Sequence, residues 1–510
     1  MDNEERSHRR AINAWCMYDW ANSAFATTIM AAVLPTFYAS VAASTLTKTQ
    51  ATSRWGYTAS IALLISAVLA PVLGAVADHT GSKKRFLASF AGLGVLAAAL
   101  MVLISTGDWL LASVLFIIGD IGFSGSYIFY DGLLPHVARQ EEIDRVSAKG
   151  FAWGYLGGGL LLAVNLLWIM KPDWFGLPGK EMASRISFLS VAVWWALFSI
   201  PLFRRVGEPP AAPGEFRGMK PLRAGLARLG HTFREIRHFR QLFLLLVAFW
   251  LYGDGIGTII KMATIYGSEI GIGQTDLIGA LLMTQFVGIP FSFIFGTLPG
   301  GTDKRKRAFQ LSIVLYNVVT TPILGVLAKA GLLGQVYTSL LGAKMGGSGA
   351  VQALLSLLLN QIPGLLLAWL VGRPLLAGVA ARLNTKRTII LSLAVYASIT
   401  VWGYFMSITA EFWLLAWMVG LVQGGSQALS RSLYAAMVPK SRSAEFFGFL
   451  SVSGKFAGIA GPFIFGVVGQ LSGSSRLSII SLIAFFIVGV FLLLRVDEKE
   501  GIRMAQEQTV

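Results

Sequence analysis

The sequence predicts an all-α polytopic membrane protein with fourteen transmembrane helices, arranged as two six-helix bundles in parallel repeat plus an inserted two-helix hairpin. Three observations support this prediction. Of the 510 residues, 55% are hydrophobic and only 13% are charged, roughly half the charge of a soluble domain. The apolar residues fall in blocks of roughly 20, the length that a helix needs to cross a bilayer. The two halves of the chain also repeat one another at fixed offsets.

The expected spans form a group of six and a group of eight. They lie near 14–41, 56–78, 86–105, 109–134, 148–170 and 184–205, and then near 241–266, 275–298, 308–328, 351–371, 388–408, 412–438, 445–470 and 476–495. We therefore expect an N-terminal bundle over 1–205, a basic cytoplasmic linker over 206–240, a C-terminal bundle over 241–495 and a cytoplasmic tail over 496–510.

The basic residues orient these spans. The termini, the even-numbered turns and the linker hold 30 of the 42 Lys and Arg residues. Because cytoplasmic loops are enriched in Lys and Arg, both termini are predicted to be cytoplasmic. The formal net charge of +16 is then explained by loops that face anionic lipid, and we expect no nucleic-acid partner. Five scattered histidines offer no metal-ligand spacing.

An internal repeat relates the two halves. Asp19 aligns with Asp254 at an offset of 235, whereas Tyr130, Pro135, Gly150, Gly154 and Gly157 each recur 304 residues later, as Tyr434, Pro439, Gly454, Gly458 and Gly461. The second half has therefore gained residues between Asp254 and Gly378, an interval that holds the two surplus spans. We interpret about 299–377 as a helical hairpin inserted in the second bundle, which leaves a six-plus-six core. Parallel six-helix repeats are typical of transporters with a substrate site at the repeat interface.

Polar side chains form stripes on four of the core helices. An ionisable group inside a span costs at least ~2.5 kcal/mol at the bilayer centre, so it usually marks a transport pathway. Residues at i, i+3, i+4 and i+7 share one helix face. The stripes consist of Asp19, Asn22 and Ser23; Asp120, Ser124, Tyr127 and Asp131; Asp254, Thr258 and Lys261; and Gln423, Gln427 and Arg431. Under the offsets these are core helices 1, 4, 7 and 10.

The charges within these stripes suggest roles. Asp254 and Lys261 lie about 10 Å apart along one helix face, so a zwitterion fits between them. Burial in a cavity that loses water favours a protonated carboxyl group, so Asp19 or Asp254 is a candidate carrier of a coupling proton. Asp131 lies near the cytoplasmic end of its span and is a candidate gate residue. Lys455, within the eleventh core helix, requires a carboxylate partner. The alternative is that these charges pair with each other and only hold the halves together.

The turn between the second and third spans carries a compact signature. Gly74, Asp78 and Gly81 precede the basic run Lys83-Lys84-Arg85. The second-half copy begins at Gly378 and has Arg382 where the aspartate stands in the first half, so we expect no equivalent contact there. An ordinary basic cytoplasmic turn is the alternative interpretation.

Glycine rows run along the fifth and eleventh core helices. Gly150, Gly154 and Gly157, like Gly454, Gly458 and Gly461, have the small-xxx-small spacing that allows helices to pack closely. The run from Gly448 to Phe456 has one residue too many for a nucleotide-binding loop and lacks a hydroxyl residue after Lys455. We therefore expect no nucleotide cofactor, and no nucleophile–base set predicts an enzyme.

Two strings are distinctive enough to suggest a family. They are WCMYDWANSAF at 15–25 and QGGSQALSRS at 423–432, the second followed by AEFFGF at 444–449. Both resemble the Unknown Major Facilitator family, which is related to the autophagy-linked vacuolar amino-acid effluxers. The resemblance covers the chain except about 299–377. It implies a major facilitator fold, cavity-lining roles for core helices 1, 4, 7 and 10, and a gating role for the glycine–aspartate turn (Gly74, Asp78, Gly81, Lys83 and Arg85).

We therefore expect a secondary active transporter that moves a small polar or zwitterionic solute, with an amino acid favoured and the proton as candidate coupling ion. The short loops favour a bacterial cytoplasmic membrane. A lipid or lysolipid flippase of the same fold is one alternative, which a lateral opening beside the hairpin would favour. A non-transporting membrane scaffold or receptor is another, although the sequence predicts no sizeable soluble domain. The inserted hairpin is expected on the outside of the bundle, where it could bind lipid or a second copy.

Overall fold

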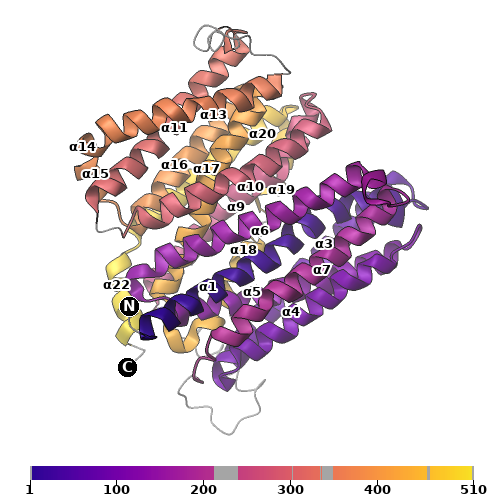
Figure 1. Ribbon diagram of the computed structural model, residues 1–510, viewed down its shortest axis with the longest axis horizontal. Helices are drawn as coiled ribbons and strands as arrows, with labels where there is room; N and C mark the ends of the chain where they lie inside the picture. The colour runs from indigo at the N-terminus through magenta and orange to yellow at the C-terminus, as the bar shows by residue number, and fades with distance from the viewer. Residues whose placement is uncertain are drawn as a thin grey trace. The chain divides into compact units, whose positions relative to one another are not determined.

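A computed structural model describes residues 3–211, 239–300, 303–333, 335, 349–456 and 460–507, and every regular element in these ranges is a helix (Figure 1). The chain forms two compact units. The first comprises Met1–Phe243, Tyr434–Lys455 and Asp497–Val510, and the second comprises Leu244–Leu433 and Phe456–Val496. The first unit thus includes two short pieces from the second half of the sequence.

The first unit is built mainly from the helices that precede the linker. These are α1 (Asn3–Ala24), continued by η1 (Phe25–Val33), α2 (Leu34–Phe37) and η2 (Tyr38–Ala42), then α3 (Lys48–Thr80), α4 (Lys83–Leu100) with η3 (Met101–Leu103), α5 (Trp109–Val137), η4 (Gln140–Glu142), α6 (Ile143–Met170), η5 (Pro172–Phe175) and α7 (Lys180–Arg205). The later pieces are η7 (Lys440–Arg442), α18 (Ser443–Phe456) and α22 (Glu498–Glu507).

The second unit holds most of the remaining helices. They are α9 (Arg240–Glu269), α10 (Gln274–Thr297), α11 (Lys304–Lys329), α13 (Gly349–Leu367) with η6 (Ala368–Gly372), α14 (Arg373–Leu375) and α15 (Ala377–Ala381), then α16 (Thr385–Phe405), α17 (Thr409–Met437), α19 (Ala460–Ser472), α20 (Ser475–Ser481) and α21 (Ile483–Arg495). The first turn of α9 and the last turn of α17 belong to the first unit.

Twelve helical segments in the described part of the chain are long and apolar enough to cross a membrane. They match twelve of the predicted spans. The two other predicted ranges, 412–438 and 445–470, are occupied by α17 and by α18 and α19, with 457–459 outside the described residues. The count of fourteen is compatible with this structure and stays a prediction. Most of the predicted linker, 212–238, also lies outside the described residues.

The first helix begins earlier than its apolar block. We expected the span to start near residue 14, but α1 begins at Asn3. Glu4 and Glu5 in the first turn suit the positive end of the helix dipole, and Arg9 donates to Glu5 at 3.0 Å one turn later. Helix-favouring charge patterning thus extends the helix into the polar N-terminal segment.

Glycines allow the closest helix contacts in the first unit, where α1 packs against α6 and α7 (Figure 1). A Cβ atom on Gly157 of α6 would stand 2.4 Å from the backbone oxygen of Trp20, and one on Gly154 would stand 2.7 Å from the Ser23 hydroxyl. The predicted close packing is therefore confirmed for this row. In the second half it holds at Gly461, whereas Gly454 faces open space and Gly458 lies outside the described residues.

The predicted hairpin is held together by a network of amide side chains. Helix α11 packs against α13 and η6 (Figure 1). The Asn317 and Gln361 amides bond each other in both directions, at 3.2 and 3.1 Å. Trp417 of α17 donates to Asn317 at 3.0 Å, which ties the hairpin to a core helix. Tyr316 donates to Asn360 at 2.8 Å, beside the amide pair. Apolar helix surfaces in a membrane do not by themselves select one register, so such polar bonds fix the register of the helices.

We predict that Asn317→Leu lowers the free energy of unfolding by about 1–2 kcal/mol, because it removes the bonds between Gln361 and α11 and leaves the buried Trp417 N–H without its acceptor. Thermal unfolding in mild detergent measures the change. The double variant Asn317→Leu/Gln361→Leu should unfold closer to the wild-type temperature than Asn317→Leu alone, since it removes both amides of the pair. Additive losses in the double variant would contradict this account of the network.

Candidate functional site

Asp19 is the carboxylate of the first polar stripe, and it is deeply buried. Its side chain on α1 is 1% exposed, and the hydroxyls of Tyr127 and Tyr130 on α5 donate to its two oxygens at 2.7 and 2.9 Å. Trp15 stacks on the Tyr130 ring at a centroid distance of 4.4 Å and donates to the Tyr130 carbonyl oxygen at 2.9 Å. The distinctive string at 15–25 thus builds a carboxylate site between core helices 1 and 4.

Other predicted residues of the first two stripes also lie inside the first unit. Asn22 is fully buried, and among the described residues no hydrogen bond reaches its side-chain amide. Ser23 is half-buried against Gly154. Asp120, 2% exposed, accepts a hydrogen bond from Ser66 of α3 at 3.2 Å. Asp19, Asn22 and Asp120 are therefore enclosed by neighbouring helices.

Asp254 occupies the matching place in the second unit. It is 1% exposed on α9, and the backbone N–H of Gly461 on α19 donates to it at 2.8 Å. Thr258, one turn along α9, is buried beside the same glycine. A Cβ atom on Gly461 would stand 2.0 Å from the Thr258 hydroxyl. The side chain of Lys261 lies outside the described residues. In each half a glycine of core helix 5 or 11 thus lets the carboxylate helix approach closely.

A mostly apolar cavity of ≈ 110 Å³ lies within the second unit, among α9, α10, α16, α17, α19 and α20. Gln423, predicted from its stripe, lines this cavity. Gln427 is half-buried and Arg431 is 4% exposed on the same helix, and neither lines the cavity. The lining also includes polar groups that the stripe analysis did not select: Thr284, Gln285, Thr400 and Tyr266. The pair Thr284-Gln285 inside an apolar span is a signal that would have found these two residues.

The signature turn of the first half forms a buried ion pair. Lys83 Nζ lies 2.6 Å from the Asp78 carboxylate, and both side chains are shielded from solvent. Asp78 also accepts from the backbone N–H groups of Ala444 and Glu445, at 3.3 and 2.7 Å, in the first turn of α18. A carboxylate at a helix N-terminus satisfies amides that lack intrahelical partners and matches the sign of the dipole. Asp78 therefore joins α3 to a helix from the second half of the sequence.

Two glycines of the signature have distinct conformational roles. A Cβ on Gly74 would stand 2.2 Å from the Ala444 carbonyl oxygen, so only glycine lets α3 approach α18 this closely. Gly81 ends α3 with a φ of 59°, the left-handed conformation that glycine adopts without strain. In the second-half copy a Cβ on Gly378 would meet nothing within 4 Å, and Arg382 is exposed.

The other gate candidates are placed differently. Arg85 is exposed and Asp131 is half-buried, while the side chain of Lys455 lies outside the described residues. Lys84 lies in the predicted basic run but is not one of the gate candidates. Its Nζ donates to the carbonyl oxygens of Phe203 and Val206 at the end of α7.

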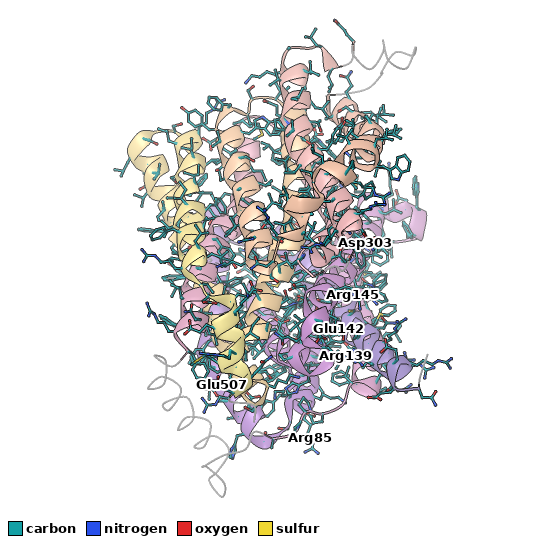
Figure 2. The ribbon with its side chains drawn as sticks, turned by 90° about the vertical axis from the view of Figure 1, so that its left-hand side faces the viewer. Arg85, Arg139, Glu142, Arg145, Asp303 and Glu507 are labelled. Atoms are coloured by element: carbon teal, nitrogen blue, oxygen red, sulfur yellow. The ribbon has the colours of Figure 1, made fainter. Side chains whose placement is uncertain are left out.

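The N-terminal helix is fastened to the start of α6 by a charged cluster. His8 bonds Glu142, which also accepts from the Arg139 backbone at 3.1 Å and pairs with Arg145 at 3.4 Å. Figure 2 shows Glu142 between the two arginines. No group of three His, Cys, Asp or Glu that could hold a metal ion occurs among the residues described.

Comparison with known proteins agrees with this architecture. Residues 7–344 and 337–506 match the family model described as vacuole effluxer Atg22 like. The chain belongs to this family. A Bacillus subtilis (strain 168) protein named as an uncharacterized MFS-type transporter, YxiO, is 34% identical over 505 residues, 97% of each chain. Autophagy-related protein 22-1 of Phaeosphaeria nodorum is 22% identical over 87% of this chain and 76% of that protein.

Solved structures show the same fold. The human organic anion transporter MFSD10 (TETRAN) superposes with a TM-score of 0.58 at 14% identity, covering 95% of this chain and 99% of that chain. The major facilitator transporter FucP, solved in its outward conformation, gives 0.58 at 12% identity over 96% of this chain and 99% of its own. The Atg22-like chain is therefore a multi-pass membrane protein with the major facilitator fold, a secondary transporter and not an enzyme.

We predict that Lys83→Gln destabilises the protein by about 3 kcal/mol, because it leaves the buried Asp78 carboxylate without its counter-charge. Arg85→Gln, two residues away and exposed, removes the same charge and should change stability by less than about 0.5 kcal/mol. Thermal unfolding of the two purified variants checks the difference. Equal effects would mean that the ion pair contributes nothing beyond the charge of the turn.

Proposed function

We propose that this Atg22-like transporter moves a small zwitterionic solute, an amino acid in the first place, by alternating access. The cavity in the second unit carries the proposal. Its wall is largely apolar, with a few polar groups from Gln423, Thr284 and Thr400. Such a wall suits an apolar side chain on a small molecule and offers amide and hydroxyl groups to orient it. The resemblance to vacuolar amino-acid effluxers points to the same substrate class.

The buried carboxylates support a coupling role. Asp19 and Asp254 lie at matching places on core helices 1 and 7, each less than 2% exposed. Two such groups within apolar bundles are costly, and carriers keep such groups for ions and protons. We propose that one of them takes up a proton during the cycle. Lys261 on the same helix as Asp254 completes the pair of charges between which a zwitterion would lie.

The Asp78 contact supports a gate. It holds α3 against the first turn of α18, which follows core helix 10 in the chain. We propose that this contact closes the cytoplasmic side and breaks when that side opens. Because basic turns favour the cytoplasmic side, we propose that both termini lie in the cytoplasm and that a bacterial cytoplasmic membrane is the site of transport.

We predict that Asp19→Asn or Asp254→Asn, whichever removes the proton carrier, abolishes pH-driven uptake, because an amide keeps the size of the carboxyl and cannot exchange a proton. Uptake of a labelled amino-acid panel into liposomes, with and without a pH gradient, measures this. Asp173→Asn, an exposed position in η5, is the matched control. If both core variants keep wild-type uptake and pH dependence, the coupling proposal fails. Lysolipid included in the panel tests the flippase alternative, and binding of an amino acid without uptake would indicate a receptor.

The cavity makes a second prediction. Ala416→Leu adds bulk to the cavity wall on α17. We expect the Michaelis constant for leucine or phenylalanine to rise about tenfold or more, because overpacking a cavity typically costs about 1–3 kcal/mol. Glycine uptake, which leaves that space unused, serves as the internal control. Equal effects on small and large amino acids would remove the cavity from the substrate path.

A further inference from the structure

A second hollow lies beside the hairpin, on the opposite side of α16 from the transport cavity. It is a groove of ≈ 780 Å³ between α11 and α16, reaching Glu411 of α17. Val326 and Ala330 line one wall, and Val401, Trp402 and Phe405 line the other. We call it the hairpin groove. Thr400 and Gly403 of α16 line the inner cavity instead, so the helix separates the two hollows.

The hairpin groove opens toward the bilayer. Its wall residues Val326 and Phe405 are 69% and 57% exposed, and Val319 and Ile323 extend the same apolar surface along α11. Both walls belong to membrane-spanning helices. In hydrocarbon an apolar groove is filled by lipid chains, since an empty hollow forfeits contacts on both walls and water finds no partners there.

One end of the groove is charged. Lys329 is the last residue of α11, where a span meets the membrane surface, and its Nζ donates to the Phe405 carbonyl oxygen at 3.0 Å. An ammonium group has three N–H donors, and among the residues that the structure describes this bond uses one of them. The Glu411 carboxylate at the inner wall accepts from the Ser407 N–H at 2.9 Å and from the Trp402 indole at 3.3 Å. The donors that bond the Glu411 carboxylate are therefore uncharged groups. These bonds do not involve the Lys329 ammonium group, whose charge can act on a ligand.

We propose that the hairpin groove binds a membrane phospholipid, with one acyl chain lying between α11 and α16 and the phosphate accepting hydrogen bonds from Lys329. Charge and polarity together favour a phospholipid as the occupant. A phosphate at headgroup depth complements the Lys329 ammonium group, and an acyl chain below it matches the apolar walls. The proposal concerns a resident lipid and is independent of which solute crosses the membrane. It also gives the inserted hairpin a specific role, since α11 supplies the lysine and one wall of the groove.

Photolabelling tests the proposal on the full chain in phosphatidylcholine liposomes. The probe is phosphatidylglycerol with a diazirine on one acyl chain, present as a minor component, and labelled peptides are mapped by mass spectrometry. We expect label on 322–330 and 398–405 to exceed label on exposed α13 residues such as Ile362 and Leu366. Lys329→Gln should lower the groove label about fivefold, the factor expected for losing one lysine–headgroup attraction.

Matched variants separate charge from shape. Lys180→Gln removes an exposed lysine at the start of α7, and Val319→Phe adds bulk on α11 outside the groove; both should leave the label unchanged. Val326→Phe fills the groove and should lower labelling by every probe. A diazirine diacylglycerol, which lacks phosphate, should be insensitive to Lys329→Gln. Label spread evenly over all exposed apolar faces, or groove label that Lys329→Gln and Val326→Phe both leave intact, would overturn the proposal.

Discussion

A polar group buried among apolar helices has to be satisfied by another part of the protein, and this constraint organises both compact units. Asp78 illustrates it: one carboxylate meets Lys83 and two backbone amides of α18, and thereby joins segments more than 360 residues apart in the chain. Asp19 is served by two tyrosine hydroxyls, and Asp254 by a glycine N–H. Because lipid offers no alternative partners, each of these contacts selects one helix arrangement among many that apolar packing would tolerate.

The duplication extends to positions that neither offset had identified. Lys84 at the start of α4 caps the carbonyl groups that end α7, and Lys386 at the start of α16 donates to the Val496 carbonyl oxygen at the end of α21, at 2.7 Å. In both halves a lysine from the third core helix holds the end of the sixth. The signature turn differs between the halves. The first half has the aspartate that reaches α18, whereas the second half has an exposed arginine at the matching position. The two halves therefore share their helix-end caps and differ at this turn.

The sequence predicted the spans well because a bilayer imposes a length and a hydropathy that local composition reveals. It also selected Asp19, Asp254 and Gln423 as candidates, since a polar residue in an apolar block is conspicuous, and their roles in transport stay predictions. It could not identify partners, because a tyrosine hydroxyl or a backbone N–H leaves no charge pattern to detect. Gly454 shows a second limit of prediction from spacing. It belongs to the same glycine row as Gly461, but a Cβ on it would meet nothing within 4 Å, because spacing does not show which side of a helix contacts a neighbour. The sequence did not indicate a specific contact for Lys84, because its partners are carbonyl oxygens, which every residue carries.

The inserted hairpin is linked to the core through one helix that also lines the cavity. Trp417 of α17 donates to Asn317 in the hairpin, and Gln423, six residues on, lines the cavity. Six residues are about 9 Å along a helix, so the hairpin bond fixes α17 less than two turns from Gln423 in the cavity wall. A hairpin that merely filled space outside the bundle would need no such bond, since apolar contacts suffice there. The buried amide pair instead fixes where α17 stands relative to α11, and it therefore helps to set the position of the Gln423 side chain in the cavity.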